Sequence, residues 1–140
     1  NQLGVEVLNY AYERMEQGIL ASIFPVSDNA EEVFVKMAHH IADMLTNHKG
    51  YATSLVITFI GIEASDISAE MEAAAKQVYI RWIRLYQDKL TACGYSEEKA
   101  ANLAPQICAL IHGMTLSCWI RKDTSELSAL EPAIRALLKK

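Results

Sequence analysis

Histidine and cysteine are the residues in this sequence whose side chains could bind a metal ion or act in acid–base and nucleophilic chemistry. The four histidines are His39, His40, His48 and His112. His39 and His40 are adjacent, so on a helix they point about 100° apart and cannot bind one metal ion from the same face. No carboxylate or thiol stands at a metal-binding spacing beside the four histidines. They are better explained as surface residues.

The three cysteines are best explained as reduced thiols. Cys93 lies at the C-terminus of a predicted helix, where the helix dipole disfavours a thiolate. Cys108 and Cys118 are separated by about 15 Å along a helix, which is too far for a disulfide. The sequence also contains no Ser–His–Asp arrangement, glycine-rich phosphate loop or CxxC pair. We therefore expect no enzymatic activity, no metal and no cofactor. An odd number of cysteines with no signal peptide at the start indicates a cytoplasmic protein.

Length and charge limit what the chain can do. Its 140 residues fit one domain, residues 1–140, which is large enough to have a core of its own. The net charge of −4 provides no overall basic character of the kind that binds nucleic acid. An apolar fraction of 51% with 21% charged residues excludes a disordered chain.

Apolar residues recur at helical spacing along most of the sequence. The segments predicted to be helical are residues 3–20, 28–50, 54–62, 68–93, 96–120 and 124–138. The third, SLVITFIGI, is too short for its pattern to distinguish a buried helix from a buried strand. Because no second strand is evident with which it could pair, we predict a buried helix. The predicted fold class is all-α, a single domain of about six helices.

Polar residues and a glycine mark several predicted helix ends. Asp28 stands three residues before Glu31, as in a capping box. Ser68 and Ser96 are predicted N-caps, and Gly94 is the predicted C-terminal glycine of a Schellman motif.

The stretch from Ala100 to Ile120 contains no Asp, Glu, Lys or Arg and is long enough to span a membrane. Polar residues are scattered around its circumference, so a lipid-facing span is a poor interpretation and no membrane partner is expected. On a helical projection the stretch has two apolar faces. The first suits the chain's own core and comprises Leu103, Ile107, Leu110, Ile111, Met114 and Cys118.

The second apolar face is predicted to meet another copy of the chain. It comprises Ala109, His112, Gly113, Leu116, Trp119 and Ile120. Because glycine in a helix interior costs about 1 kcal/mol relative to alanine, Gly113 favours the close approach of another backbone. Two helices from each subunit could then form a four-helix-bundle dimer interface, the last helix contributing a second stripe. That stripe comprises Leu127, Leu130, Ile134 and Leu137. Ordinary packing within one subunit is the alternative.

Pro105 and Pro132 lie inside two of the predicted helices. Each removes a backbone hydrogen bond and either kinks its helix, which can leave a cavity, or marks the start of a helix. The sequence does not distinguish these alternatives.

Adaptable and aromatic side chains at helical spacing predict either an ordinary core or a mainly apolar ligand pocket. Three buried stripes and the apolar segment that crosses between them supply seven candidate ligand-binding residues. These are Phe34, Met37, Phe59, Trp82, Tyr86, Leu110 and Met114. The hydroxyl of Tyr86 would be a polar handle for the ligand.

Three segments of the sequence resemble a known family. The start, NQLGVEVLNYAYERM, resembles the first helix after the helix-turn-helix domain of TetR/AcrR-family transcriptional regulators. GYATSLVITFIGIEASDISAEM is similar to a buried helix and the start of the longest helix in the LmrA/YxaF-like subgroup. CALIHGMTLSCWIRKDTSEL is similar to the subgroup's penultimate helix. The chain therefore resembles the C-terminal regulatory domain of that subgroup, by pattern and order rather than by an active-site signature.

The resemblance implies a homodimer joined through the last two long helices, and a small, lipophilic effector bound among the central helices. Effector binding repositions DNA-binding heads in that family and commonly releases a repressor from its operator. No helix-turn-helix occurs in this sequence, so operator DNA is expected to be bound only by a segment upstream of Asn1. Pro105 departs from the family pattern. A small α-helical enzyme with an unrecognised site and a ligand-free dimerisation scaffold are the alternatives. An empty cavity of a few hundred Å³ would favour the sensor over the scaffold.

Overall fold

The computed structural model describes residues 2–47 and 53–139, and all regular secondary structure in these ranges is helical. The α-helices are α1 (Gln2–Ser22), α2 (Ala30–Asn47), α3 (Thr53–Ile67), α4 (Ala69–Ala92), α5 (Glu97–Arg121) and α6 (Leu130–Leu138). Two 3-10 helices are η1 (Phe24–Val26) and η2 (Ser125–Ala129). The prediction of an all-α single domain is confirmed, and so is the helix in the SLVITFIGI segment. His48 and the predicted helix end at residue 50 lie outside the described residues.

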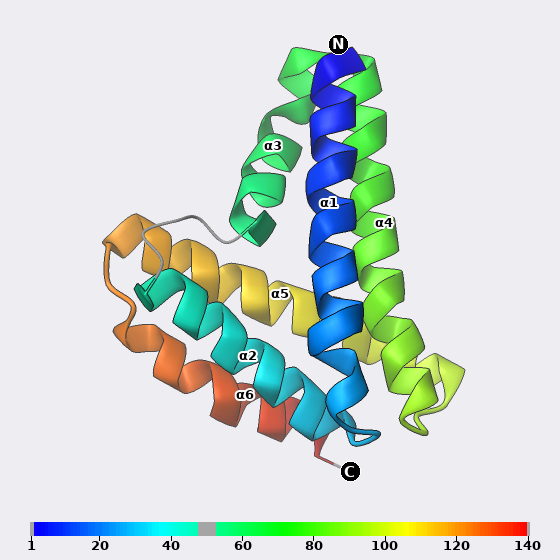
Figure 1. The fold of residues 1–140 in the computed structure, drawn as a ribbon, viewed down its shortest axis with the longest axis vertical. Helices are drawn as coiled ribbons and strands as arrows, with labels where there is room; N and C mark the ends of the chain where they lie inside the picture. The colour runs from blue at the N-terminus through cyan, green and yellow to red at the C-terminus, as the bar shows by residue number, and fades with distance from the viewer. Residues whose placement is uncertain (1, 48–52, 140) are drawn as a thin grey trace.

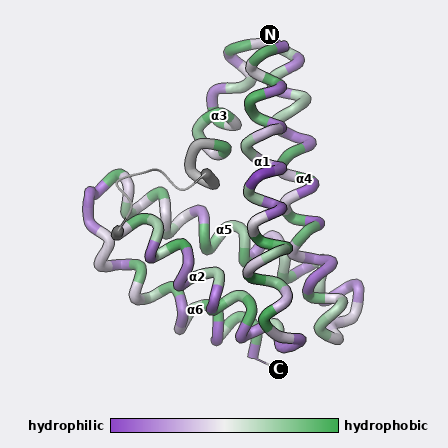
Figure 2. Tube along the Cα trace, in the orientation of Figure 1, coloured by the Kyte–Doolittle hydropathy of each residue, from purple (hydrophilic) through white to green (hydrophobic). Residues whose placement is uncertain are grey.

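The helices form two groups that cross each other (Figure 1). In the first group α1, α3 and α4 pack side by side along the long axis of the molecule. In the second, α6 packs against both α2 and α5 across the lower end. The groups are joined because α4 also packs against α5. Hydrophobic and hydrophilic positions alternate along the helices, as expected when each helix has one buried face (Figure 2).

Most of the predicted helix caps are present. The Ser68 Oγ accepts a hydrogen bond from the backbone N–H of Met71 at 3.1 Å, at the start of α4. The Ser96 Oγ accepts one from Lys99 at 3.2 Å, at the start of α5. Gly94 has a φ of 95°, the left-handed conformation that a Schellman motif requires after α4. These caps fix where the two longest helices begin and where α4 ends.

The N-cap of α2 differs from the prediction by one residue. The Oδ1 of Asn29, not the side chain of Asp28, accepts the backbone N–H of Glu32 at 3.2 Å. Asn and Asp are equally good N-caps, and each of these two residues stands three positions before a glutamate. The sequence pattern therefore could not separate the two positions.

The buried face of α1 is narrower than the sequence pattern indicated. The spacing of apolar residues places Leu3, Val7, Leu8, Tyr12 and Ile19 on one broad face of this helix. Leu8, Tyr12 and Ile19 are buried, as this pattern predicts. Leu3 and Val7 were expected on the same face but are 72% and 50% exposed. α3 and α4 both pack against α1, and Leu3 and Val7 lie on the surface of α1 that these helices leave uncovered.

The two prolines behave differently. Pro105 lies inside α5, which continues as one α-helix from Glu97 to Arg121. Pro132 lies in the first turn of α6, where its missing N–H removes little hydrogen bonding. The last helix predicted for residues 124–138 is therefore divided into η2 and a nine-residue α6, and Pro132 marks a helix start.

Within the described part of the chain, α5 alone meets the length and composition of a membrane-spanning helix. In its most apolar window, 39% of the residues are buried inside the structure. One such helix is weak evidence for a membrane span, because the core helix of a soluble protein has the same properties.

Candidate ligand cavity

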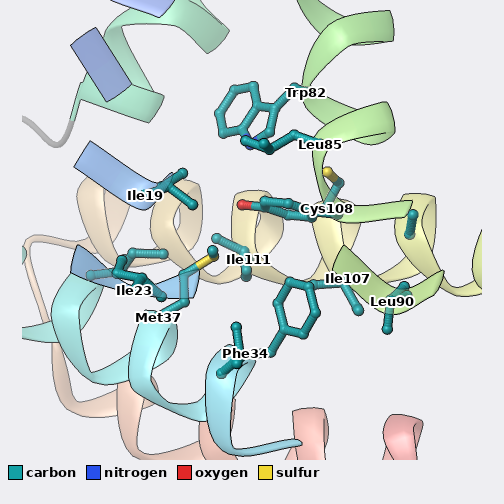
Figure 3. Packing of buried hydrophobic residues seen from close by; sticks show 14 of the residues in the cluster. Ile19, Ile23, Phe34, Met37, Trp82, Leu85, Leu90, Ile107, Cys108 and Ile111 are labelled. Atoms are coloured by element: carbon teal, nitrogen blue, oxygen red, sulfur yellow. The ribbon is translucent and has the colours of Figure 1, made fainter. Parts of the chain in front are cut away.

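A cavity of about 310 Å³ lies between α1, α2, α4 and α5. This volume is at the lower end of the range of about 300–1,000 Å³ typical of small-molecule sites. Figure 3 shows Ile19 and Ile23 on the α1 side and Met37 of α2 approaching Ile111 of α5, with Trp82 of α4 above them. The complete lining is Arg14, Met15, Gly18, Ile19, Ser22, Ile23, Met37, His40, Ile41, Met44, Trp82, Tyr86 and Ile111.

The α1 side of the cavity contains a row of exposed residues one turn apart, Arg14, Gly18 and Ser22. A Cβ atom added at Gly18 would have no neighbour within 4 Å. Packing therefore does not require a glycine there, although glycine destabilises a helix interior by about 1 kcal/mol relative to alanine. The missing side chain leaves open space beside the cavity.

Trp82 forms the centre of an aromatic cluster next to the cavity. It is 1% exposed, and its ring centroid lies 5.7 Å from that of Tyr79 and 4.3 Å from that of His112. Its indole N–H lies close to the Tyr86 hydroxyl and slightly lowers the pKa of that hydroxyl. Burial raises the same pKa by a larger amount. The geometry is nevertheless not that of a hydrogen bond, so the buried N–H has no partner within the described structure.

His112 faces this cluster from α5 rather than lying on an open helix face. Burial lowers the pKa of its imidazole to about 4, so the ring is neutral at physiological pH. Its buried Nε2 atom has no hydrogen-bond partner among the described residues. Those residues also contain no group of three or more His, Cys, Asp or Glu side chains placed to hold a metal ion.

Tyr86 is buried, and burial raises the pKa of its hydroxyl above the usual value. The phenol is therefore neutral and can both donate and accept a hydrogen bond. Because Tyr86 lines the cavity, its predicted role as a polar handle is compatible with its position.

The predicted ligand-binding residues divide into two groups. Those that line the cavity are Met37, Trp82 and Tyr86. Phe34 is fully buried and packs edge to face on Tyr86, with ring centroids 5.3 Å apart, but does not line the cavity. Phe59 of α3 packs on Trp119, with their ring centroids 4.9 Å apart. The remaining two, which pack against the core outside the lining, are Leu110 and Met114.

Sequence reasoning missed the contribution of α1 and of the outer face of α2. Arg14, Gly18 and His40 line the cavity but were not among the candidates. His40 was interpreted as a surface histidine, and it is exposed, but one side of it borders the cavity. The one available signal was Gly18, a glycine inside the predicted helix 3–20 that packing does not require.

The residues predicted to form the dimer interface lie in different environments. Four of the six predicted residues on α5 lie along one side that is exposed or partly exposed, namely Ala109, Gly113, Leu116 and Ile120. The other two are half-buried. His112 and Trp119, the half-buried pair, pack against α4 and α3 aromatic rings. The apolar stripe from the last helix is covered within the chain, because α6 packs against α2 and α5. Its buried members are Leu127, Leu130 and Ile134, and Leu137 is partly buried.

A second hollow of about 580 Å³ lies near the C-terminal end of α6. Its lining is mainly polar and includes Asp28, Glu31 and Glu32 from the start of α2. It therefore lacks the apolar walls expected of a small-molecule site, and the first cavity is the better candidate although it is smaller.

Comparison with known proteins connects this structure to a family. The family described as "Transcriptional regulator LmrA/YxaF-like, C-terminal domain" matches residues 26–132. Two relatives from Bacillus subtilis (strain 168), the uncharacterized HTH-type transcriptional regulator YxaF and the HTH-type transcriptional regulator LmrA, are each 26% identical over 141 aligned positions. The alignments cover 99% of this chain and 72% and 73% of the two relatives. The family match includes the α2, α4 and α5 walls of the cavity.

Proposed function

The chain belongs to the LmrA/YxaF-like transcriptional regulators, of which it contains the C-terminal domain, and we propose that it senses a small, mainly apolar effector in the cavity between α1, α2, α4 and α5. The observation that carries this proposal is the cavity itself. Its walls combine aliphatic and methionine side chains with two aromatic residues, Trp82 and Tyr86. Such a lining is typical of sites for small lipophilic molecules.

The position of the cavity suggests how effector binding is transmitted. α1 forms one wall of the cavity. From there it runs away from the second helix group, and its N-terminus lies at the far end of the molecule (Figure 1). An effector wedged against Met15 and Ile19 would displace α1 relative to α2, which carries Met37 and Ile41 on the facing wall. A small shift at the cavity would then move the N-terminal end of α1.

The two relatives support a role for this domain in transcription. Both relatives are named as HTH-type regulators, and more than a quarter of each lies outside its alignment with this chain. We propose that operator DNA is bound by such a helix-turn-helix segment and not by residues 1–140. The effector releases the protein, acting as a repressor, from its operator. A protein with this role would work in the cytoplasm.

We also propose that two chains associate through the exposed side of α5. Ala109 and Gly113 provide a low surface on which another helix could approach closely, and Ile120, 64% exposed, extends the apolar surface. Because α6 uses its apolar stripe within the chain, its contribution to such a dimer would come from its outer surface. A symmetric pair is the commonest form of homo-oligomer.

Occupancy of the cavity can be tested with N-phenyl-1-naphthylamine, an uncharged apolar fluorophore. We expect it to bind the unmodified chain and the Gly18→Ala variant, because a single methyl group meets open space. Gly18→Leu and Met15→Trp should each weaken binding by about tenfold or more, since both fill space at the α1 wall. Unchanged binding in both blocking variants would place the fluorophore elsewhere and contradict the proposal.

A further inference from the structure

The polar side chains around the cavity are biased towards hydrogen-bond donors. They are Arg14, Ser22, His40, Trp82 and Tyr86. Arginine and tryptophan side chains can only donate, whereas hydroxyls and a neutral imidazole can also accept. No aspartate or glutamate is among the lining residues, so there is no side chain that can only accept. A ligand that complements this lining must supply acceptors.

Arg14 gives the cavity a fixed positive charge. Its side chain makes no ion pair with another described residue. By contrast, Arg81 of α4 pairs with Glu16 of α1, with Nη2 and Oε2 2.9 Å apart. His40 faces the cavity from α2, whereas the adjacent His39 pairs with Glu131 of α6. The mouth of the cavity is therefore bordered by one cation and one further N–H donor. A cationic ligand would meet a like charge there.

Trp82 lines the cavity, and its indole N–H is a second donor, enclosed beside the Tyr86 hydroxyl. Its N–H is buried and has no partner among the described residues. A buried donor without a partner is costly, and few such groups occur in folded proteins. A ligand atom that accepts this hydrogen bond would remove that cost, whereas a purely aliphatic ligand would not.

On the basis of the proposed function, we infer that the effector is a small apolar acid. Its anionic group lies at the mouth of the cavity beside Arg14 and His40. Its apolar body occupies the space between Ile19, Met37 and Ile111, and an acceptor atom on that body takes the Trp82 N–H once the ligand has shifted the indole. A carboxylate, a phenolate or a sulfonate meets the charge requirement equally well.

Two fluorophores that share one aromatic skeleton test the charge preference. 1-Anilinonaphthalene-8-sulfonate carries an anionic group, and N-phenyl-1-naphthylamine lacks it. Arg14→Gln should weaken binding of the sulfonate about fivefold, the upper end of the effect of an exposed ion pair. The same substitution should leave binding of the uncharged fluorophore unchanged. The matched control is Arg84→Gln, which removes the same charge from an exposed position of α4 outside the cavity and should affect neither probe.

The outcomes separate the inference from the proposed function. If Gly18→Leu weakens both probes but Arg14→Gln does not weaken the sulfonate more than Arg84→Gln does, the acid preference is wrong and the cavity remains the binding site. If Gly18→Leu and Met15→Trp leave both probes unchanged, the cavity is not the binding site and both statements fail. Selective loss of the sulfonate in Arg14→Gln, together with loss of both probes in Gly18→Leu, supports both.

Discussion

The rings of Trp82 and His112 meet edge to face with their centroids 4.3 Å apart, and each ring has a buried nitrogen without a hydrogen-bond partner in the described structure. This contact joins α4 to α5 directly beside the cavity. Trp82 lines the cavity, whereas His112 sits on the helix that we propose for dimerisation. A ligand that moves the indole would therefore press on α5 through one ring contact.

The buried imidazole of His112 predicts a pH-dependent stability. Its pKa is about 4 in the folded chain and about 6.5 when exposed, so between these values the unfolded chain binds more protons. Stability is therefore retained above pH 6.5 and falls as the pH is lowered. We expect a loss of about 2 kcal/mol between pH 7 and pH 5. Urea denaturation at both pH values, compared with His112→Phe, measures it, and an equal loss in the two proteins would refute the assignment.

Two substitutions at Trp82 separate its role in packing from its role at the ligand. Trp82→Ala should destabilise the fold by about 3–5 kcal/mol, because the ring is buried among three aromatic neighbours. Trp82→Phe retains much of the ring volume but removes the N–H donor. We expect it to lower affinity for an acceptor-bearing ligand by about threefold to tenfold, with a smaller change in stability. If Trp82→Phe and Trp82→Ala lose stability but their folded fractions bind 1-anilinonaphthalene-8-sulfonate normally, Trp82 only packs the core.

Gly113 provides a test of the proposed dimer that does not depend on the core. A Cβ atom at Gly113 would meet nothing within 4 Å in the single chain, so a larger side chain is tolerated by the fold itself. The unmodified chain should sediment as a dimer at micromolar concentration, and Gly113→Leu should dissociate it by holding two α5 helices apart. Ala73→Leu, which adds bulk at an exposed position of α4, is the control. A monomer in the unmodified protein would exclude the dimer.

The net charge of −4 predicts that residues 1–140 do not bind operator DNA by themselves. Fluorescence anisotropy with labelled operator DNA at two salt concentrations should show no salt-dependent binding by this fragment. A protein that also carries a helix-turn-helix segment should bind. Tight, sequence-specific binding by the 140 residues alone would contradict the proposed division of labour.

The fold was largely predictable because its signals are local. Val78 and Leu85 stand at helical spacing within the predicted helix 68–93 and are buried in α4, and Ser68 caps that helix as predicted. The helix start at Leu130 and the exposure of Leu3 were not predictable, because they depend on which neighbouring helices cover each face.

The cavity was only partly predictable for a physical reason. Met37, Trp82 and Tyr86 stand out as large apolar residues at helical spacing, and such residues line cavities as well as cores. Arg14 and His40 look like ordinary exposed residues until α1 and α2 are placed against each other. Hydrophobic periodicity identifies the buried face of each helix, but not where two faces fail to meet.

The central claim is that a small apolar molecule binds in the cavity next to Trp82, and energy transfer from that residue tests it most directly. The measurement uses a Trp119→Phe background, in which Trp82 is the one indole in the chain, and N-phenyl-1-naphthylamine as the acceptor. We predict efficient transfer when Gly18 is unchanged or replaced by alanine, and loss of transfer in Gly18→Leu. Transfer that persists at full strength in both Gly18→Leu and Met15→Trp would show that the probe does not occupy this cavity and would contradict the account.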